Sequence, residues 1–294
     1  MKATRRDDMT IDANDAASPL QRRVSELIAA AALEIIPLTR AEGKVLDAPR
    51  HTPLTITCSP RFGLERTAAH VESAVGKGYR VVPHLAARMV ADEGELRAFV
   101  TRMRDLGVDD LYVIGGDADE PVGTFGSAVE LLDALQGFDH GMRRIGVGCY
   151  PEGHPKIADE TLIEALLAKQ VHASYMVSQL CFDSEALVRW VLETRSAGVT
   201  LPLRIGMAAP IRTTRLAELS LRIGVGQSLR FLAKQHGMVG NLLLGRTYAP
   251  EVLLRELGEQ LSNPELGVEG LHIFTFNQVD VTVAWQNRFA REVC

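Results

Sequence analysis

The sequence has few of the features that mark secreted or metal-stabilised proteins. Its 294 residues include only four cysteines, and Cys58, Cys149, Cys181 and Cys294 form no CxxC pair and no metal-ligand spacing. Three of them lie in apolar runs, where cysteine behaves as a small hydrophobic residue. We therefore expect reduced core thiols and a cytoplasmic protein.

Long apolar segments and an excess of positive charge are also missing. The richest apolar stretch, LIAAAALEIIPL, is short and contains Glu34, and the polar residues 1–18 have no signal-like apolar core. A formal net charge of -5 argues against a nucleic-acid or membrane partner. We expect a poorly ordered segment over residues 1–18 and one folded domain over residues 19–294.

What the chain does have is a regular alternation of apolar runs and helical periodicity. The eight apolar runs, which predict strands, are residues 32–37, 54–59, 80–85, 110–116, 144–150, 173–180, 202–209 and 271–276. Between them apolar residues return every three or four positions, and no GxGxxG follows the first run. The pattern predicts a single (β/α)8 TIM barrel, with two helical stretches, 227–239 and 249–261, before the last strand.

Polar side chains end most of these predicted strands, where the active site of such a barrel lies. Glu34 stands out because a carboxyl inside an apolar strand must be paired, hydrogen-bonded or protonated. It is a candidate general acid, or alternatively a rim carboxylate bonded to backbone. Asp117 follows two glycines and is either a ligand contact or a turn aspartate. Gln179 suits the edge of an amide-like heterocycle, or could tie down a loop.

The histidines at these strand ends do not form a recognisable metal motif. His84 and His154 are isolated from any HxH or HExxH pattern, so we expect hydrogen-bonding roles and no metal. Lys169, near the end of a predicted helix, is most simply interpreted as a solvated charge at a favourable end of the helix dipole.

Taken in order, the strand-end motifs resemble those of the methylenetetrahydrofolate reductase family. The members of this family are flavoproteins with a (β/α)8 barrel. The matching segments are LEIIP, TIT, PHL, GGD, YPEGHP, SQLCFD and FTFN, spread over residues 32 to about 290. Each is weak alone, but their order on successive predicted strands is specific. The turn YPEGHP is similar to the family's YPExHP turn, in which the tyrosine and histidine help to hold the flavin.

The resemblance implies an oxidoreductase of one-carbon metabolism and methionine biosynthesis that interconverts 5,10-methylenetetrahydrofolate and 5-methyltetrahydrofolate. NADH or NADPH would reduce FAD, and the flavin would pass hydride to the folate. Glu34, Asp117 and Gln179 would be the catalytic residues and would contact the pterin, with Phe276 and Asn277 also near the substrate. The implied flavin contacts are Thr57, His84, Asp117, Tyr150, His154, Lys169 and Phe274, with Lys169 and His154 as phosphate partners.

Several positions depart from the family pattern and leave more than one function open. Gly115 stands where the family has arginine, and Ile35, Ile36, Cys58, Phe274 and Gln278 also differ from its usual residues. FAD binding could therefore be weakened or lost, which leaves a flavin-free reductase as one possibility. A pterin-binding barrel that transfers a methyl group is a second, and a non-catalytic folate- or flavin-binding paralogue is a third.

The remaining expectations concern partners. Homo-oligomerisation is expected from the frequency of oligomers among soluble enzymes. The anionic glutamate tail of a folate could meet Arg61, Arg66 or Arg288, although a charged rim is more often simply solvated.

Overall fold

The computed structural model describes residues 17–39, 43–222 and 247–293. Eight strands form one closed barrel in which every strand pairs in parallel with its neighbour and β8 returns to β1. The strands are β1 (Ala32–Ile35), β2 (Leu54–Ile56), β3 (Val81–Ala86), β4 (Asp110–Ile114), β5 (Arg144–Cys149), β6 (Tyr175–Ser178), β7 (Leu203–Ala208) and β8 (Val268–Phe274). The predicted (β/α)8 barrel is confirmed.

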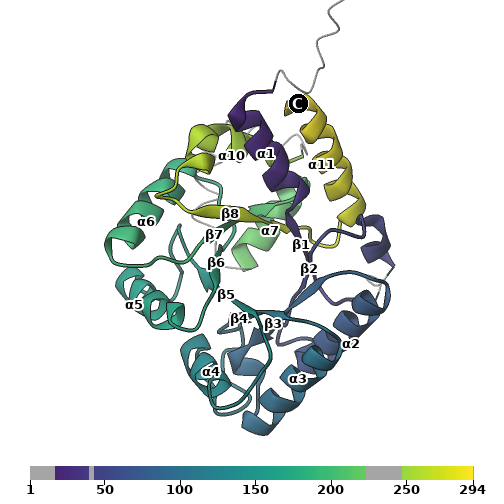
Figure 1. Cartoon of the computed structure of the whole chain (residues 1–294), viewed down its shortest axis with the longest axis vertical. Coiled ribbons are helices and arrows are strands. Elements are labelled where there is room, and N and C mark those ends of the chain that lie inside the picture. The colour runs from purple at the N-terminus through teal and green to yellow at the C-terminus, as the bar shows by residue number, and fades with distance from the viewer. Residues whose placement is uncertain (1–16, 40–42, 223–246, 294) are drawn as a thin grey trace, which may run out of the picture.

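Helices alternate with these strands and surround the barrel (Figure 1). The α-helices are α1 (Pro19–Ala29), α2 (Gly63–Gly76), α3 (Glu93–Asp105), α4 (Ala128–Leu135), α5 (Asp159–Gln170), α6 (Ser184–Ser196), α7 (Thr213–Arg222), α10 (Glu251–Leu257) and α11 (Val279–Val293). Short 3-10 helices are η3 (Lys44–Asp47), η4 (Ala87–Met89) and η5 (Gly258–Ser262). The predicted stretch 249–261 corresponds to α10 and η5, whereas 227–239 lies outside the described residues.

Local sequence explains where several helices begin. The hydroxyl or carboxylate oxygens of Asp92, Ser127 and Asp183 accept a hydrogen bond from the backbone three residues on and start α3, α4 and α6. α1 was not predicted, although Ser18 and Gln21 form a reciprocal capping box at its start. α1 packs beside α11, so the first and last helices lie together (Figure 1).

Charged side chains close the amino-terminal end of the barrel. The Tyr175 hydroxyl donates to Asp110 at 2.8 Å, and the Arg204 guanidinium stacks on the Tyr175 ring at 3.6 Å. Arg204 and Arg144 both donate to Glu269. In such barrels, residues at the amino-terminal end typically stabilise the fold. The active site is expected at the opposite end, where the strands have their carboxyl ends.

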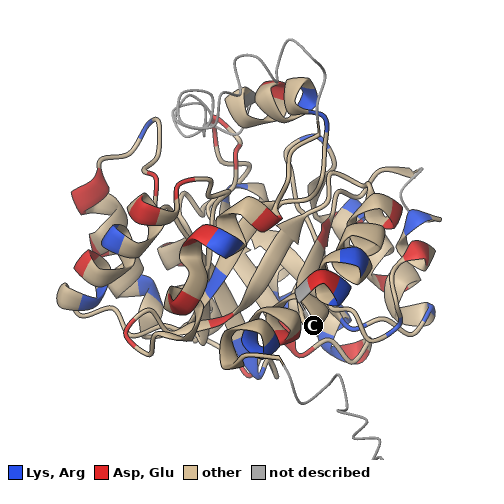
Figure 2. Ribbon diagram, turned by 90° about the horizontal axis from the view of Figure 1, so that it is seen from above, with Lys and Arg blue, Asp and Glu red and all other residues tan. Residues whose placement is uncertain are grey.

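The buried core consists of the apolar strand and helix faces that the periodicity predicted. Cys58, Cys149 and Cys181 are unpaired and buried, as expected for core thiols, and Cys294 lies outside the described residues. Figure 2 shows acidic and basic residues interspersed over the outer helices, with no broad field of one sign in the parts of the chain that the structure describes. Within the same ranges, no helix is both long and apolar enough to span a membrane.

Candidate active site

Glu34 lies near the carboxyl end of β1, on the barrel seam. In register it pairs with Thr55 on β2 and with Phe274 on β8. Its side chain is 12% exposed, so the carboxyl is partly withdrawn from water. The Glu34 carbonyl accepts a hydrogen bond from Thr275 at 2.5 Å. β1 and β8 thus hold the predicted acid firmly at the mouth of the barrel.

Two buried histidines face the Glu34 carboxyl from other strands. Nε2 of His272, on β8, is 3.1 Å from Glu34 Oε2, and Nε2 of His84, on β3, is 3.8 Å from the same oxygen. His84 Nε2 has no hydrogen-bond partner. Burial, and secondly the nearby His272, lower the pKa of His84 well below its usual value. His84 is therefore neutral near pH 7.

The same three residues offer atoms that could bind a metal ion, all within 4.8 Å of one another. Two nitrogen or oxygen ligands of one tetrahedral zinc ion lie roughly 3.3–3.4 Å apart, because each is about 2.0–2.1 Å from the metal. The 3.8 Å between Glu34 and His84 is wider than this, and the 3.1 Å between Glu34 and His272 is a hydrogen-bond distance. Glu34, His84 and His272 therefore form a triad in which only Glu34 and His272 are within hydrogen-bond distance, while His84 lies beside them without a partner at Nε2.

Sequence reasoning missed His272 and Tyr112, which complete the floor of this region. The Tyr112 ring, on β4, lies edge-on to His84 with centroids 4.7 Å apart, and His272 lies 4.9 Å from Phe274. Burial raises the pKa of Tyr112 well above its usual value, so its hydroxyl stays protonated. The signal was present: His272 and Phe274 are two residues apart on one strand and therefore share its inner face.

A second group of predicted residues gathers after β4 and β5. The Tyr150 and His154 rings meet edge-on with centroids 5.1 Å apart. Burial, then the negative charge of Asp117, raise the pKa of Tyr150 to about 12. Burial lowers the pKa of His154, partly opposed by the same Asp117 charge. Asp117 is exposed and follows Gly116, whose φ of +94° requires glycine.

Gly148 on β5 connects the two groups. A β-carbon at this position would lie 3.3 Å from the Tyr112 hydroxyl and 3.9 Å from the Tyr150 hydroxyl. Both hydroxyls therefore converge on the same small residue. Tyr112 also contacts His84. The triad and the group formed by Asp117, Tyr150 and His154 therefore lie at the same end of the barrel, around its opening.

Gln179 reaches the mouth from the end of β6. A β-carbon at Gly206 would lie 3.0 Å from the Gln179 carbonyl oxygen and 3.0 Å from the Phe274 ring. The backbone carbonyl of Gln179 and the Phe274 ring thus both border Gly206. The Gln179 side-chain oxygen accepts a hydrogen bond from the Leu180 N–H at 2.9 Å.

The YPEGHP turn also has a structural role, carried by Glu152. Its Oε1 accepts hydrogen bonds from the backbone N–H groups of Phe182, at 2.7 Å, and Asp183, at 3.0 Å. The turn after β5 therefore holds the loop after β6. Sequence reasoning assigned no role to this glutamate.

Lys169 is not a solvated charge, and that interpretation was wrong. The side chain is buried, with 8% exposed, and Nζ donates to the Gly148 carbonyl at 2.8 Å. Burial lowers the pKa of this ammonium group. α5 and β5 thus enclose Lys169, in contrast to the rim position expected for a helix-end lysine.

The other candidates at the rim are held in different ways. The Thr57 backbone N–H donates to Ile35, and its carbonyl accepts from Thr67. Asn277 is buried, and its amide both accepts from the Ile36 N–H and donates to the Ile36 carbonyl. Phe276 precedes it with φ of 50° and packs on a small apolar cluster around Phe182 and Tyr248. Asn277 is thus engaged in closing the seam between β1 and β8.

The three candidate arginines for an anionic tail are exposed and separate. Arg66 lies 3.3 Å from the Thr39 hydroxyl, and the Arg61 guanidinium lies over the Phe62 ring. Arg288 is on α11, 3.7 Å from Glu292. Arg61 and Arg66 lie near the start of α2, whereas Arg288 lies on a different helix, α11.

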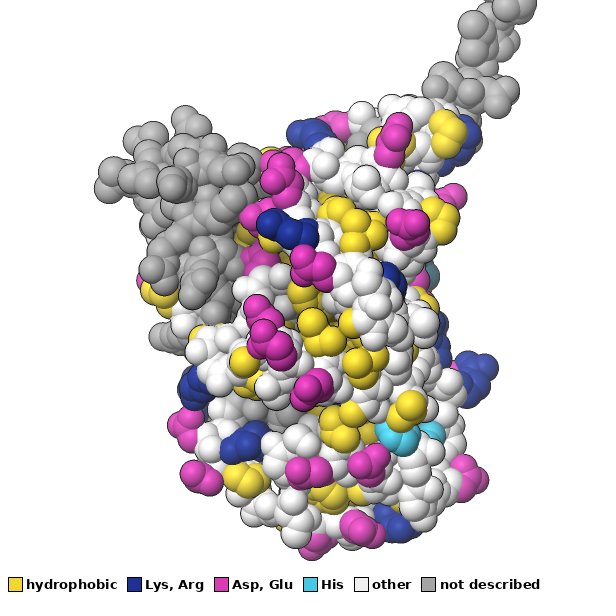
Figure 3. Space-filling model, turned by 90° about the vertical axis from the view of Figure 1, so that its left-hand side faces the viewer, with side chains coloured by type: hydrophobic (Ala, Val, Ile, Leu, Met, Phe, Trp, Pro, Cys, Tyr) yellow, Lys and Arg dark blue, Asp and Glu magenta, His cyan; other side chains and the backbone are white. Residues whose placement is uncertain are grey.

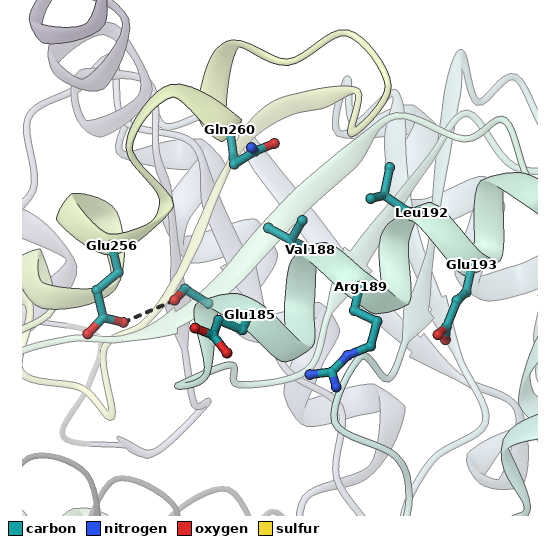
Figure 4. Close-up of a pocket in the computed structure, with 8 residues that line it drawn as sticks. Glu185, Val188, Arg189, Leu192, Glu193, Glu256 and Gln260 are labelled. Atoms are coloured by element: carbon teal, nitrogen blue, oxygen red, sulfur yellow. Dashed lines mark hydrogen bonds between the residues drawn. The ribbon is translucent and has the colours of Figure 1, made fainter.

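A groove of about 520 Å³ lies away from the mouth, between α6 and the α10–η5 segment. Figure 4 shows its lining, in which Val188 and Leu192 alternate with charged residues and Ser184 donates to Glu256 at 3.1 Å. The face that contains α6 carries scattered apolar and acidic side chains (Figure 3). The groove contains none of the residues predicted for catalysis.

Similar proteins are found by sequence and by structure. The sequence model of the family described as methylenetetrahydrofolate reductase matches residues 63–286. A putative lyase/mutase from Burkholderia cenocepacia shares 16% identity over 94% of this chain and 89% of its own, with a TM-score of 0.48. Dihydropteroate synthase from Thermus thermophilus shares 16% identity over 89% of this chain and 92% of its own, with a TM-score of 0.41.

The family match includes β3 to β8 and the turn with Tyr150 and His154, while Glu34 precedes it. Those elements carry most of the mouth of the barrel. Because the match covers most of the chain, the protein belongs to the methylenetetrahydrofolate reductase family, a family of folate-related barrel enzymes.

Proposed function

We propose that the protein interconverts 5,10-methylenetetrahydrofolate and 5-methyltetrahydrofolate, with NADH or NADPH as the source of hydride. The observation that carries this proposal is the partly buried Glu34 carboxyl, held 3.1 Å from His272 at the mouth of a barrel of this family. Such a carboxyl is poorly placed for mere solvation, and its position suits proton transfer to a bound substrate.

The chemistry assigns a separate task to each polar group. Glu34 donates a proton to nitrogen 10 of the substrate, the bond from this nitrogen to the bridging carbon breaks, and nitrogen 5 is left as an iminium cation. Hydride then adds to the bridging carbon and forms the methyl group. Asp117 stabilises positive charge on the pterin, which is the electrostatic term expected to dominate such a step. The Gln179 amide hydrogen-bonds the pterin edge.

FAD is the carrier that family membership suggests, and the described residues fit only part of it. Tyr150, His154 and the glycine turn at Gly115 and Gly116 suit recognition of a ring, and a β-carbon at Gly115 would meet nothing within 4 Å. The pyrophosphate of FAD fits the described residues poorly. Its two expected partners are Lys169 and His154. The Lys169 ammonium group is buried and donates to the Gly148 carbonyl, and burial lowers the pKa of His154 and so favours its neutral form.

A further cation near the mouth is also engaged. The Arg88 guanidinium donates to the backbone carbonyls of Ala118, at 2.7 Å, and Gly126, at 3.1 Å. It therefore holds the loop after β4. These contacts favour a second candidate function, in which hydride passes from the nicotinamide to the folate without a flavin.

The test is anaerobic incubation of the purified protein with 5,10-methylenetetrahydrofolate and NADH or NADPH, with and without added FAD. Mass spectrometry measures 5-methyltetrahydrofolate, and absorbance measures the nicotinamide oxidised. We expect one product per nicotinamide oxidised. Absence of product with either nicotinamide, with and without FAD, would reject the proposal and favour a methyl-transferring or a non-catalytic barrel.

The same incubation distinguishes the two carriers. A visible flavin band that bleaches with the nicotinamide and returns with the folate supports FAD. Product formed at an unchanged rate by colourless protein, with no dependence on added FAD, supports direct transfer.

A further inference from the structure

Glu34 is more exposed to solvent than the two histidines of the triad. The Glu34 side chain is 12% exposed, while those of His84 and His272 are 5% and 2% exposed. The carboxyl is therefore the member that a substrate can reach. His272 lies two residues before Phe274 on β8 and is the more deeply buried of the pair, so we expect it to act on a substrate through Glu34.

Both histidine contacts go to the same oxygen of the carboxyl. Oε2 of Glu34 faces His272 Nε2 at 3.1 Å and His84 Nε2 at 3.8 Å. Only the first is within hydrogen-bond distance. A protonated carboxyl has one O–H and can place it on either oxygen. If Nε2 of His272 carries the hydrogen, Oε2 must accept, and the acidic proton belongs on Oε1.

Among the polar groups that the structure describes around Glu34, His272 is the one within hydrogen-bond distance of Oε2. His84 is neutral, because burial and the neighbouring His272 lower its pKa, so it supplies no charge to the carboxyl. Tyr112 keeps its proton, because burial raises its pKa. The remaining nearby polar group is Thr55, which pairs with Glu34 in register and whose buried hydroxyl has no hydrogen-bond partner. In the described part of the chain, His272 is thus the group that can donate to Oε2 directly.

We propose that His272 is the positioning residue of the acid: its Nε2–H binds Oε2 of Glu34 and so directs the acidic proton to Oε1, toward the substrate. This inference rests on the proposed function, in which Glu34 is the acid. When the proton leaves Oε1 for nitrogen 10 of the folate, Glu34 becomes a carboxylate. The same Nε2–H then stabilises the new negative charge as a charge-assisted hydrogen bond. His272 itself neither gains nor loses a proton.

The experiment compares two replacements of His272 with a control. His272→Leu removes the donor and keeps an apolar side chain, whereas His272→Gln keeps an N–H at similar reach. His172→Gln is the matched control, because His172 lies 3.0 Å from Asp133 and forms an imidazole–carboxylate contact away from the mouth. Each variant is assayed for 5-methyltetrahydrofolate formation from pH 5 to 9.

For His272→Leu we expect kcat to fall by about 10- to 100-fold, with KM changed by less than about threefold, because the acid is misdirected and not lost. The limb of the kcat profile that requires a protonated carboxyl should move to higher pH, since the carboxylate has lost its donor. His272→Gln should restore the position of the limb in part, and the control should leave it in place. A fall in kcat without movement of the limb would indicate a merely structural role and overturn the proposal.

A second readout does not depend on turnover. In protein labelled with nitrogen-15 in histidine, the resonances that disappear in His272→Gln belong to His272, and their shifts identify its tautomer. We expect the hydrogen on Nε2. A hydrogen on Nδ1, or stoichiometric metal in the purified protein that is lost in His272→Leu, would overturn the proposal. Wild-type protein without folate turnover but with the Nε2–H tautomer would reject the proposed function and leave the hydrogen bond intact.

Discussion

At the scale of single residues, Asn277 shows how a strand-end side chain can close the barrel. Its amide accepts from the Ile36 N–H at 2.9 Å and donates to the Ile36 carbonyl at 3.0 Å, and its φ is 63°. Asparagine tolerates this left-handed conformation better than most residues. The Asn277 amide therefore hydrogen-bonds two backbone groups of Ile36, while its own backbone adopts a left-handed conformation after β8.

Asn277→Ala should lower the free energy of unfolding by about 2–4 kcal/mol, because two backbone groups lose their partner. Denaturant unfolding followed by circular dichroism measures the loss. Asn277→Gly is the matched control, since it loses the same hydrogen bonds without strain at positive φ. If Asn277→Gly is as stable as the wild type, the amide contributes nothing and the account of the seam is wrong.

Sequence reasoning named some residues at the mouth of the barrel and missed others for a physical reason. Glu34 was recognisable because a carboxyl is rare in an apolar strand. His272 lies in an equally apolar run, but its importance depends on β8 closing against β1, a contact between residues 238 positions apart. The burial of Lys169 likewise depends on how α5 packs on β5, which the local sequence of the helix does not determine.

At the scale of elements, the packing of β6 and β7 depends on Gly206. A β-carbon there would lie 2.1 Å from the Ser178 carbonyl oxygen and 3.0 Å from the Phe274 ring. The Gly206 N–H also donates to the Ser178 hydroxyl at 2.7 Å. Strand spacing and the position of Phe274 are therefore coupled at this point.

Gly206→Ala should destabilise the protein by about 1–3 kcal/mol or more, because the methyl group overpacks a region that cannot yield without moving a strand. Gly270→Ala on β8 is the control: its nearest contact would be 3.8 Å, an ordinary van der Waals distance. Thermal unfolding compares the two. Equal midpoints for both variants would show that β6 moves away freely.

The elements themselves were largely predictable, and their boundaries less so. All eight strands were predicted, but β8 begins at Val268, before the predicted residue 271, since Glu269 interrupts the apolar run there. Glu269 is needed at this position to bind Arg144 and Arg204 at the closed end of the barrel. α1 was missed because it precedes the first strand and lies outside the strand–helix alternation.

At the scale of the whole molecule, the buried neutral His84 links stability to pH. Its pKa is lowered in the folded protein, so between the folded value and about 6.5 the unfolded chain binds the additional proton. Stability from this residue is therefore complete above about pH 6.5 and decreases as the pH falls toward the folded pKa, by at most about 1.4 kcal/mol per pH unit.

His84→Asn should remove this contribution and flatten the decline of unfolding free energy between pH 7 and pH 5. The exposed His51, replaced as His51→Asn, is the control and should leave the decline unchanged. Urea unfolding at a series of pH values measures both. A decline that is as steep in His84→Asn as in the wild type would show that other groups cause it.

The central claim is that Glu34 is the acid of a folate reductase, and the most direct test is the rate of 5-methyltetrahydrofolate formation by Glu34→Gln under anaerobic conditions. The amide keeps the shape of the side chain and cannot deliver the proton. We predict a loss of about two to four orders of magnitude, the scale of general acid catalysis, with equilibrium folate binding changed by less than about tenfold. A variant that retains its rate within about tenfold of the wild type would contradict the account.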